Sequence, residues 1–178
     1  MGSGSSKVDH SAFHQLNDPS VLIGRWHVML TNSPMWLKGD KLRPRITFQD
    51  PMDTAETNVL WESVDYTLAK GGNQEFIEGV DIHNQDGKDK SHLSWSGSGW
   101  MALVSKEWYV VYLDRVAGVA AFYFEPSRVE VLVKDPKRSK DDPAVVAAKT
   151  KLASVTGLQG LTENMEFPAG WEAAASPS

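Results

Sequence analysis

Short segments in which apolar and polar residues alternate follow one another along most of the chain. Each segment is rich in β-branched and aromatic residues and is closed by Gly, Asn, Asp or Pro, which is typical of antiparallel strands joined by turns. The pattern predicts eight strands: 22–31, 44–49, 58–69, 74–83, 91–104, 107–114, 117–125 and 128–134. Their connections are too short for crossover helices, so consecutive strands should be neighbours in an up-and-down meander.

One segment near the C-terminus has a helical pattern instead. Asp142 can cap a helix, Pro143 suits the first helical position, and Gly157 can end it. Between them the apolar residues recur on one face, at Val145, Ala148, Leu152 and Val155. We therefore expect an amphipathic helix over 143–156 that lies on a sheet, followed by one more short strand over 162–167.

Eight antiparallel strands are best accommodated by closing the sheet, because closure removes exposed strand edges. The predicted fold class is all-β: an eight-stranded antiparallel up-and-down barrel with one C-terminal α-helix packed on its outside. A barrel of this size is either filled by its own side chains or holds one small ligand.

Composition and charge narrow the function. The 178 residues fit one domain, and 18 Lys and Arg against 23 Asp and Glu give a formal charge of −5, so we expect no nucleic-acid partner. Without cysteine the chain has no disulfide, thiolate nucleophile or Cys-type zinc site. No long apolar run, metal-ligand set or cofactor motif is evident, so we expect no membrane span, metal or cofactor. The pattern carries no signal for an oligomer.

Both ends of the chain are predicted to be flexible tails. Residues 1–20 are predicted to be a flexible N-terminal tail that starts with a Gly/Ser run typical of an expression leftover. Residues 21–167 form the single domain, and 168–178 a flexible C-terminal tail. The start also lacks the pattern of a signal peptide, which together with the absence of cysteine predicts a cytoplasmic protein.

Several blocks resemble the lipocalin family. Gly24-Arg25-Trp26 is similar to the Gly-x-Trp signature of that family, and Ile77-Glu78-Gly79 is similar to a block of apolipoprotein D-like and bacterial lipocalins. Residues 108–114 resemble the sixth-strand block, and 129–136 the last barrel strand before the helix. The resemblance covers residues 21–165 and implies the barrel fold and a ligand cavity.

The same resemblance gives individual residues a role. In lipocalins the indole of the Gly-x-Trp block, here Trp26, closes the narrow end of the barrel. Lys134 stands where lipocalins usually have an arginine over this indole, and a lysine can still form a cation–π contact there. Residues 33–36 and 95–100 are also similar to cysteine-free, lipocalin-like proteins of fungi.

Aromatic residues are the main candidates for the cavity wall, since apolar ligand sites are lined by aromatic side chains. Strand alternation does not say which face is inside, so Trp61, Trp95, Trp100 and Tyr109 can equally line the cavity or pack outside. Met35 and Trp36 lie in the long 32–43 connection, which resembles a flap over the open end. The predicted ligand-binding residues are Met35, Trp36, Phe48, Trp61, Trp95, Trp100, Tyr109, Val111 and Glu130.

The last predicted strand can be oriented in two ways. Val129, Val131 and Val133 share one face, while Arg128 and Glu130 share the other. The valines would normally face inward, but if the helix covers them outside, Arg128 and Glu130 face the cavity, as the family register favours.

Two functions of different classes follow. The first is a protein that binds a small hydrophobic molecule, aromatic or terpenoid/polyketide-like, in the barrel. The second is an enzyme on the same fold, an isomerase or cyclase of a natural-product intermediate in biosynthesis, with Glu130 or Asp65 as acid–base group and Arg128 as charge stabiliser.

Overall fold

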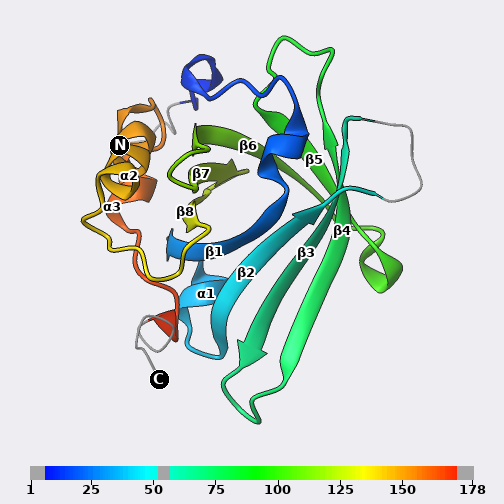
Figure 1. Cartoon of the computed structure of the whole chain (residues 1–178), viewed down its shortest axis with the longest axis vertical. Helices are drawn as coiled ribbons and strands as arrows, with labels where there is room; N and C mark the ends of the chain where they lie inside the picture. The colour runs from blue at the N-terminus through cyan, green and yellow to red at the C-terminus, as the bar shows by residue number, and fades with distance from the viewer. Residues whose placement is uncertain (1–6, 52–56, 172–178) are drawn as a thin grey trace, which may run out of the picture.

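The computed structural model describes residues 7–51 and 57–171, apart from the side chain of Trp100. Eight antiparallel strands form one closed barrel in chain order, with β8 paired to β1 (Figure 1). The strands are β1 (Gly24–Thr31), β2 (Lys41–Gln49), β3 (Val59–Leu68), β4 (Gln74–His83), β5 (His92–Gly97), β6 (Ser105–Asp114), β7 (Val119–Phe124) and β8 (Arg128–Val133). The predicted fold class is confirmed.

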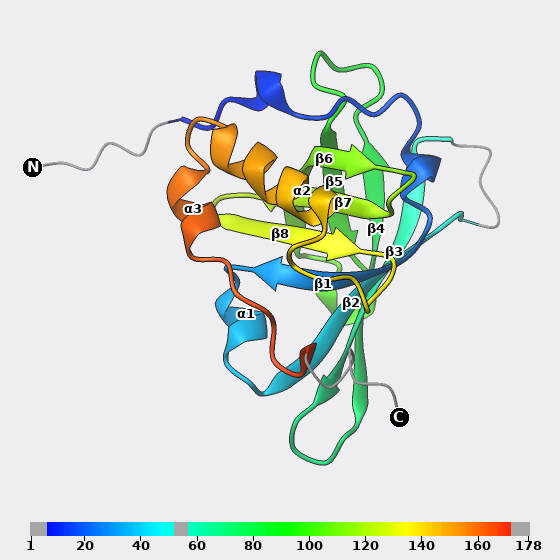
Figure 2. The same cartoon turned by 60° about the vertical axis from the view of Figure 1, so that its left-hand side comes forward.

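The main helix lies against the outside of the barrel. This helix, α2 (Pro143–Ser154), crosses β6, β7 and β8 (Figure 2). The Asp142 side chain accepts a hydrogen bond from the Ala144 N–H, and Pro143 occupies the first turn, as predicted. Two shorter helices are α1 (Pro34–Leu37) and α3 (Gln159–Glu163). Within the described residues, no helix combines the length and apolar character that crossing a membrane requires.

Two predicted elements differ from the structure. The predicted strand 91–104 is too long, because β5 ends at Gly97 and a 3₁₀ turn, η3 (Gly99–Met101), follows. A side chain at position 97 would collide with Met101, so the chain can turn here only at glycine. The segment 162–167 contains the end of α3 and a single bridge from Glu166 to Thr31 instead of a strand.

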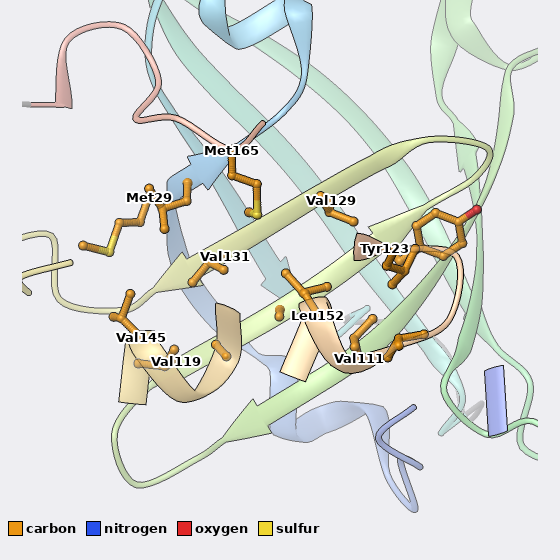
Figure 3. Close-up of a cluster of buried hydrophobic side chains, with 14 of the residues drawn as sticks. Met29, Val111, Val119, Tyr123, Val129, Val131, Val145, Leu152 and Met165 are labelled. Carbon is orange, nitrogen blue, oxygen red and sulfur yellow. The ribbon is translucent and has the colours of Figure 1, made fainter. Parts of the chain in front are cut away.

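Strands β6, β7 and β8 carry apolar residues on both faces, which creates two cores. All six residues of β7 are buried, and so are all but the first of β8. Figure 3 shows the outer core, in which Val111, Val119 and Val131 lie with Val145 and Leu152 of α2. The inner core fills much of the barrel with Trp26, Val28, Ile46, Phe48, Leu60, Leu93, Trp95, Trp108, Val110, Phe122 and Leu132. The valine face of β8 therefore lies under the helix, and Glu130 faces inward.

Trp26 closes one end of the barrel, as the resemblance implied. Its side chain is fully buried, and its Nε1 donates a hydrogen bond to the carbonyl of Leu22 at 2.7 Å. The Lys134 Nζ lies 4.9 Å from the centre of the indole ring, so the lysine does form the cation–π contact.

Parts of both predicted tails pack against the barrel. Residues 7–22 contain two 3₁₀ turns, η1 (His10–Ala12) and η2 (Pro19–Leu22), and bury Phe13 and Leu16 against the barrel. At the other end, Trp171 is 7% exposed and belongs to the outer core. The packed domain thus extends over 7–171, and the Gly/Ser run 1–6 and residues 172–178 lie outside the described part.

We expect Trp26→Ala to lower the free energy of unfolding by about 3–5 kcal/mol, since it removes a fully buried large aromatic side chain. Phe76→Ala is the control: this side chain is 58% exposed, so the change should stay within about 0.5 kcal/mol. Urea unfolding of both variants beside the parent measures the difference. Equal losses would contradict the closing role of Trp26.

Candidate functional site

The barrel end opposite Trp26 is partly open to solvent. Tyr66 of β3 and Ile77 of β4 pack against the inner core, yet both are partly exposed. The short helix α1 lies at this end and places the buried Trp36 against Tyr66, with ring centres 5.6 Å apart. The inner core is therefore less completely covered at this end than at Trp26.

Two carboxyl groups lie side by side inside the barrel. Glu62 of β3 and Asp81 of β4 are both buried, because strand alternation turns them inward together with Leu60. Their side chains are hydrogen-bonded to each other, and the Trp108 Nε1 donates a second hydrogen bond to Asp81 Oδ1 at 2.7 Å. We call Glu62 and Asp81 the carboxyl pair.

Burial makes the carboxyl pair hold a proton. Desolvation raises the pKa of Asp81 to about 7, although the hydrogen bonds from Trp108 and Glu62 act in the opposite direction. Desolvation and the neighbouring Asp81 charge raise the pKa of Glu62 well above its usual value. Near neutral pH, Glu62 is therefore the protonated partner and donates to the Asp81 carboxylate.

A third carboxyl group reaches into the interior from β8. Glu130 Oε1 accepts hydrogen bonds from Trp36 Nε1 at 3.1 Å and Thr31 Oγ1 at 3.3 Å, and the Arg128 Nε lies 3.7 Å away. Burial raises the pKa of Glu130, whereas Arg128 opposes this shift. The charge of Glu130 also raises the pKa of Glu62, whereas that of Arg128 lowers it.

Three buried polar atoms of this site have no hydrogen-bond partner among the described residues. They are Glu130 Oε2, Trp95 Nε1 and Arg128 Nε, and the side chains of Glu130 and Trp95 are at least nine-tenths buried. Trp95 lies directly over Gly79, where a Cβ atom would collide with the indole, and Gly79 is the strand partner of Glu62. A buried polar atom without a partner is costly, so these atoms indicate a group that the chain itself does not supply.

Comparison with known proteins identifies the fold. No family model and no curated protein matches the sequence. Among solved structures, insecticyanin of the tobacco hornworm Manduca sexta is 16% identical, with 93% of this chain and 87% of that chain covered and a TM-score of 0.64. The bovine lipocalin allergen Bos d 2 is 15% identical, with 90% and 99% covered and a TM-score of 0.52. The chain has the lipocalin fold. The amine binding protein of Rhodnius prolixus, in its tryptamine complex, is 10% identical, with 92% and 91% covered and a TM-score of 0.54.

The lipocalin barrel brings part of the predicted site together. Trp36, Phe48, Trp95 and Glu130 are buried and belong to the interior, and Met35 packs against it while remaining partly exposed. Arg128 lies at the rim, with its guanidinium 3.7 Å from the centre of the Phe124 ring. The side chain of Trp100 lies outside the described part of the chain.

Two of the predicted ligand-binding residues on β6 face the wrong way. Tyr109 and Val111 belong to the outer core, since the lipocalin barrel is covered here by α2 and by the N-terminal segment. The Tyr109 ring lies 5.7 Å from Phe13 and 6.0 Å from Tyr123. Their neighbours Trp108 and Val110 occupy the interior instead.

Two predicted site residues on β3 are also corrected. Because Glu62 points inward, its neighbour Trp61 faces outward, and so does Asp65. The Asp65 carboxylate forms an ion pair with Arg45 on the outer face and accepts a hydrogen bond from Gln74 at 2.8 Å. It cannot act as the acid–base group of an interior site.

Both members of the carboxyl pair were missed from the sequence. On β3 the inward residues Glu62 and Tyr66 alternate with outward residues that are also mixed in polarity, so no pattern separates the two faces.

In the described part of the chain, no three His, Asp or Glu side chains are arranged to hold a metal ion.

The carboxyl pair should make stability depend on pH. Since the folded state raises both pKa values, it binds more protons than the unfolded state, and the free energy of unfolding falls as pH rises from about 4.5 to about 7. In Glu62→Gln the amide takes no proton, so we expect this fall to be smaller by about 1 kcal/mol or more. Urea unfolding of parent and variant across this pH range tests the prediction, and parallel profiles would contradict it.

Proposed function

We propose that the protein binds one small, mainly apolar molecule inside the barrel, which enters at the end opposite Trp26. The observation that carries this proposal is the set of buried atoms without partners among the described residues, Glu130 Oε2, Trp95 Nε1 and Arg128 Nε. A ligand with a few polar groups would satisfy them, as is usual for sites that combine an apolar wall with a small number of placed polar groups.

The wall around these atoms favours an aromatic or similarly flat ligand. Trp108 stacks with Phe48 at 5.7 Å between ring centres and lies 4.8 Å from Phe122, while Trp36 and Trp95 add two more indoles. Aromatic rings prefer such offset and tilted arrangements, so a flat ligand can join them. The amine binding protein of Rhodnius prolixus, which shares the fold, was solved with tryptamine, a small aromatic molecule.

Helix α1 has the position of a flap over the entrance. Trp36 is tied to the interior by its hydrogen bond to Glu130, and Met35 beside it remains partly exposed. A ligand bound to Glu130 would contact the indole of Trp36. We therefore propose that α1 contributes to binding as well as to closing the entrance.

An enzymatic function has one observation in its favour. The carboxyl pair places a protonated acid, Glu62, beside a carboxylate, Asp81, within the same interior. Such a pair could both give and take a proton, as an isomerase or cyclase requires. Mass spectrometry of a bound ligand before and after incubation tests this second candidate, because only an enzyme converts the ligand to a product.

The binding proposal is tested with the neutral fluorescent probe N-phenyl-1-naphthylamine. We expect saturable binding with one-to-one stoichiometry, and we expect Trp36→Ala to weaken it about tenfold or more, since it removes a large aromatic contact. Trp61→Ala is the matched control, because this tryptophan lies on the outer face. Its affinity should equal that of the parent.

Thermal unfolding of both variants establishes that they are folded before the titration is compared. Absence of saturable binding to the folded parent would contradict the proposal. Equal weakening by Trp36→Ala and Trp61→Ala would also contradict it, because the probe would then not be bound inside the barrel.

A further inference from the structure

Two N–H groups of the interior site have no acceptor among the described residues. They are the Nε1 of Trp95 on β5 and the Nε of Arg128 on β8, and both nitrogen atoms are buried. An indole nitrogen and a guanidinium nitrogen can donate hydrogen bonds but cannot accept them. A group that satisfies these two atoms must therefore be a hydrogen-bond acceptor.

Trp95 differs in this respect from the other tryptophans of the inner core. Within the described residues, the others each donate from Nε1 to an oxygen of the chain, at 2.7 Å, 3.1 Å and 2.7 Å: Trp26, Trp36 and Trp108. Beside the Trp95 Nε1 lies Gly79 of β4, which has no side chain that could accept from it. Because a buried donor without an acceptor is costly, Trp95 indicates a partner that the described chain does not supply.

Glu130 has a third free atom, which can donate as well. Its Oε1 accepts from Trp36 Nε1 and from Thr31 Oγ1, and the Thr31 hydroxyl itself accepts from the Ser33 N–H at 3.0 Å. With Oε1 occupied by two donors, a proton on this carboxyl group lies on Oε2, the oxygen without a partner. Burial raises the pKa of Glu130 and so favours the protonated form, in which Oε2 is a donor.

We propose that the ligand of the interior site is a neutral aromatic carbonyl compound of the quinone type. One carbonyl oxygen accepts from Trp95 Nε1, and a second, on the opposite edge of the ring, accepts from Arg128 and Glu130. This inference rests on the proposed binding function and adds the chemical class of the ligand.

The wall between the two donor groups is aromatic. The Arg128 guanidinium lies 3.7 Å from the centre of the Phe124 ring, and Phe124 stacks on Trp108 with ring centres 5.7 Å apart. Trp108 is the strand partner of Leu93, two residues before Trp95. Since β5 to β8 are neighbours in this order, a flat ligand against these rings has Trp95 at one edge and Arg128 at the other.

A carbonyl oxygen suits these donors better than a hydroxyl or a carboxylate does. It accepts two hydrogen bonds and adds no donor that would itself need a partner. The Arg128 Nε lies 3.7 Å from Glu130 Oε1, which is too long for a hydrogen bond, yet the two side chains are close enough to share one acceptor. A carboxylate would add negative charge to an interior that already holds the carboxyl pair.

The test compares two probes with the same carbon skeleton, 2-methyl-1,4-naphthoquinone and 2-methylnaphthalene. Isothermal titration calorimetry near pH 6 should give an affinity about tenfold higher for the quinone, because the hydrocarbon leaves the buried donors without partners. Hydrophobic transfer alone would favour the hydrocarbon, so the sign of the difference is decisive. The chain has no cysteine, so the quinone meets no thiol with which it could react.

Three variants locate the effect. Trp95→Phe removes the Nε1 donor but keeps an aromatic ring, so quinone affinity should fall about tenfold while hydrocarbon affinity is kept. Trp61→Phe is the matched control on the outer face and should leave both affinities unchanged. Glu130→Gln should keep the quinone preference, because its amide oxygen can accept from Trp36 and Thr31 while its nitrogen donates in place of Oε2.

The carbonyl stretching bands of the isotope-labelled quinone provide a second measurement that binding strength alone does not move. Hydrogen bonds lower these infrared frequencies, and we expect Trp95→Phe to raise one of the two bands and Trp61→Phe to raise neither.

The results distinguish failure of this inference from failure of the binding function. If the hydrocarbon binds the parent as tightly as the quinone, the inference is wrong and the binding function stands. If Trp95→Phe keeps the quinone preference, or Glu130→Gln loses it, the acceptor does not lie where we place it and the inference is overturned. If neither probe nor the naphthylamine binds, the binding function fails and the inference with it.

Discussion

The packing of α2 on the outside of β6, β7 and β8 is the constraint on which the rest of the structure depends. Because Val119, Val131 and their neighbours bury one face of these strands beneath Val145 and Leu152, the opposite face must line the barrel. A shift of one residue in β8 would place Glu130 under an apolar helix without a partner, at a large energetic cost. The helix thus sets the inward direction of Glu130.

Inside the barrel, apolar surroundings decide what the acidic groups can do. Carboxylates are poorly solvated there, so Glu62 retains its proton and Asp81 carries its charge with help from Trp108. Replacement of the pair by apolar residues would remove this electrostatic cost. The carboxyl pair is costly to the fold, and it lies beside polar atoms without partners among the described residues. Ligand binding explains these two features better than stability does.

Much of the fold could be predicted from sequence, whereas only part of the site could. The strand order, α2 and the position of Trp26 follow from local patterns, and Glu130 could be placed once the helix was assumed to cover the valine face of β8. The carboxyl pair could not be found this way, because β4 carries exposed apolar residues, Phe76 and Ile82, on its outer face. By alternation alone, Phe76 and Ile82 would be assigned to the interior and Asp81 to the outer face. The buried N-terminal segment was missed because it has no periodic pattern.

Glu62 and Asp81 share a proton inside the barrel near neutral pH. Carbon-13 NMR of the side-chain carboxyl groups, followed from about pH 3 to pH 9 and assigned with Glu62→Gln and Asp81→Asn, measures this directly. We predict that Asp81 titrates near pH 7 and that Glu62 is still protonated where ordinary carboxyl groups are ionised. Titration of both groups below about pH 5 would contradict this claim.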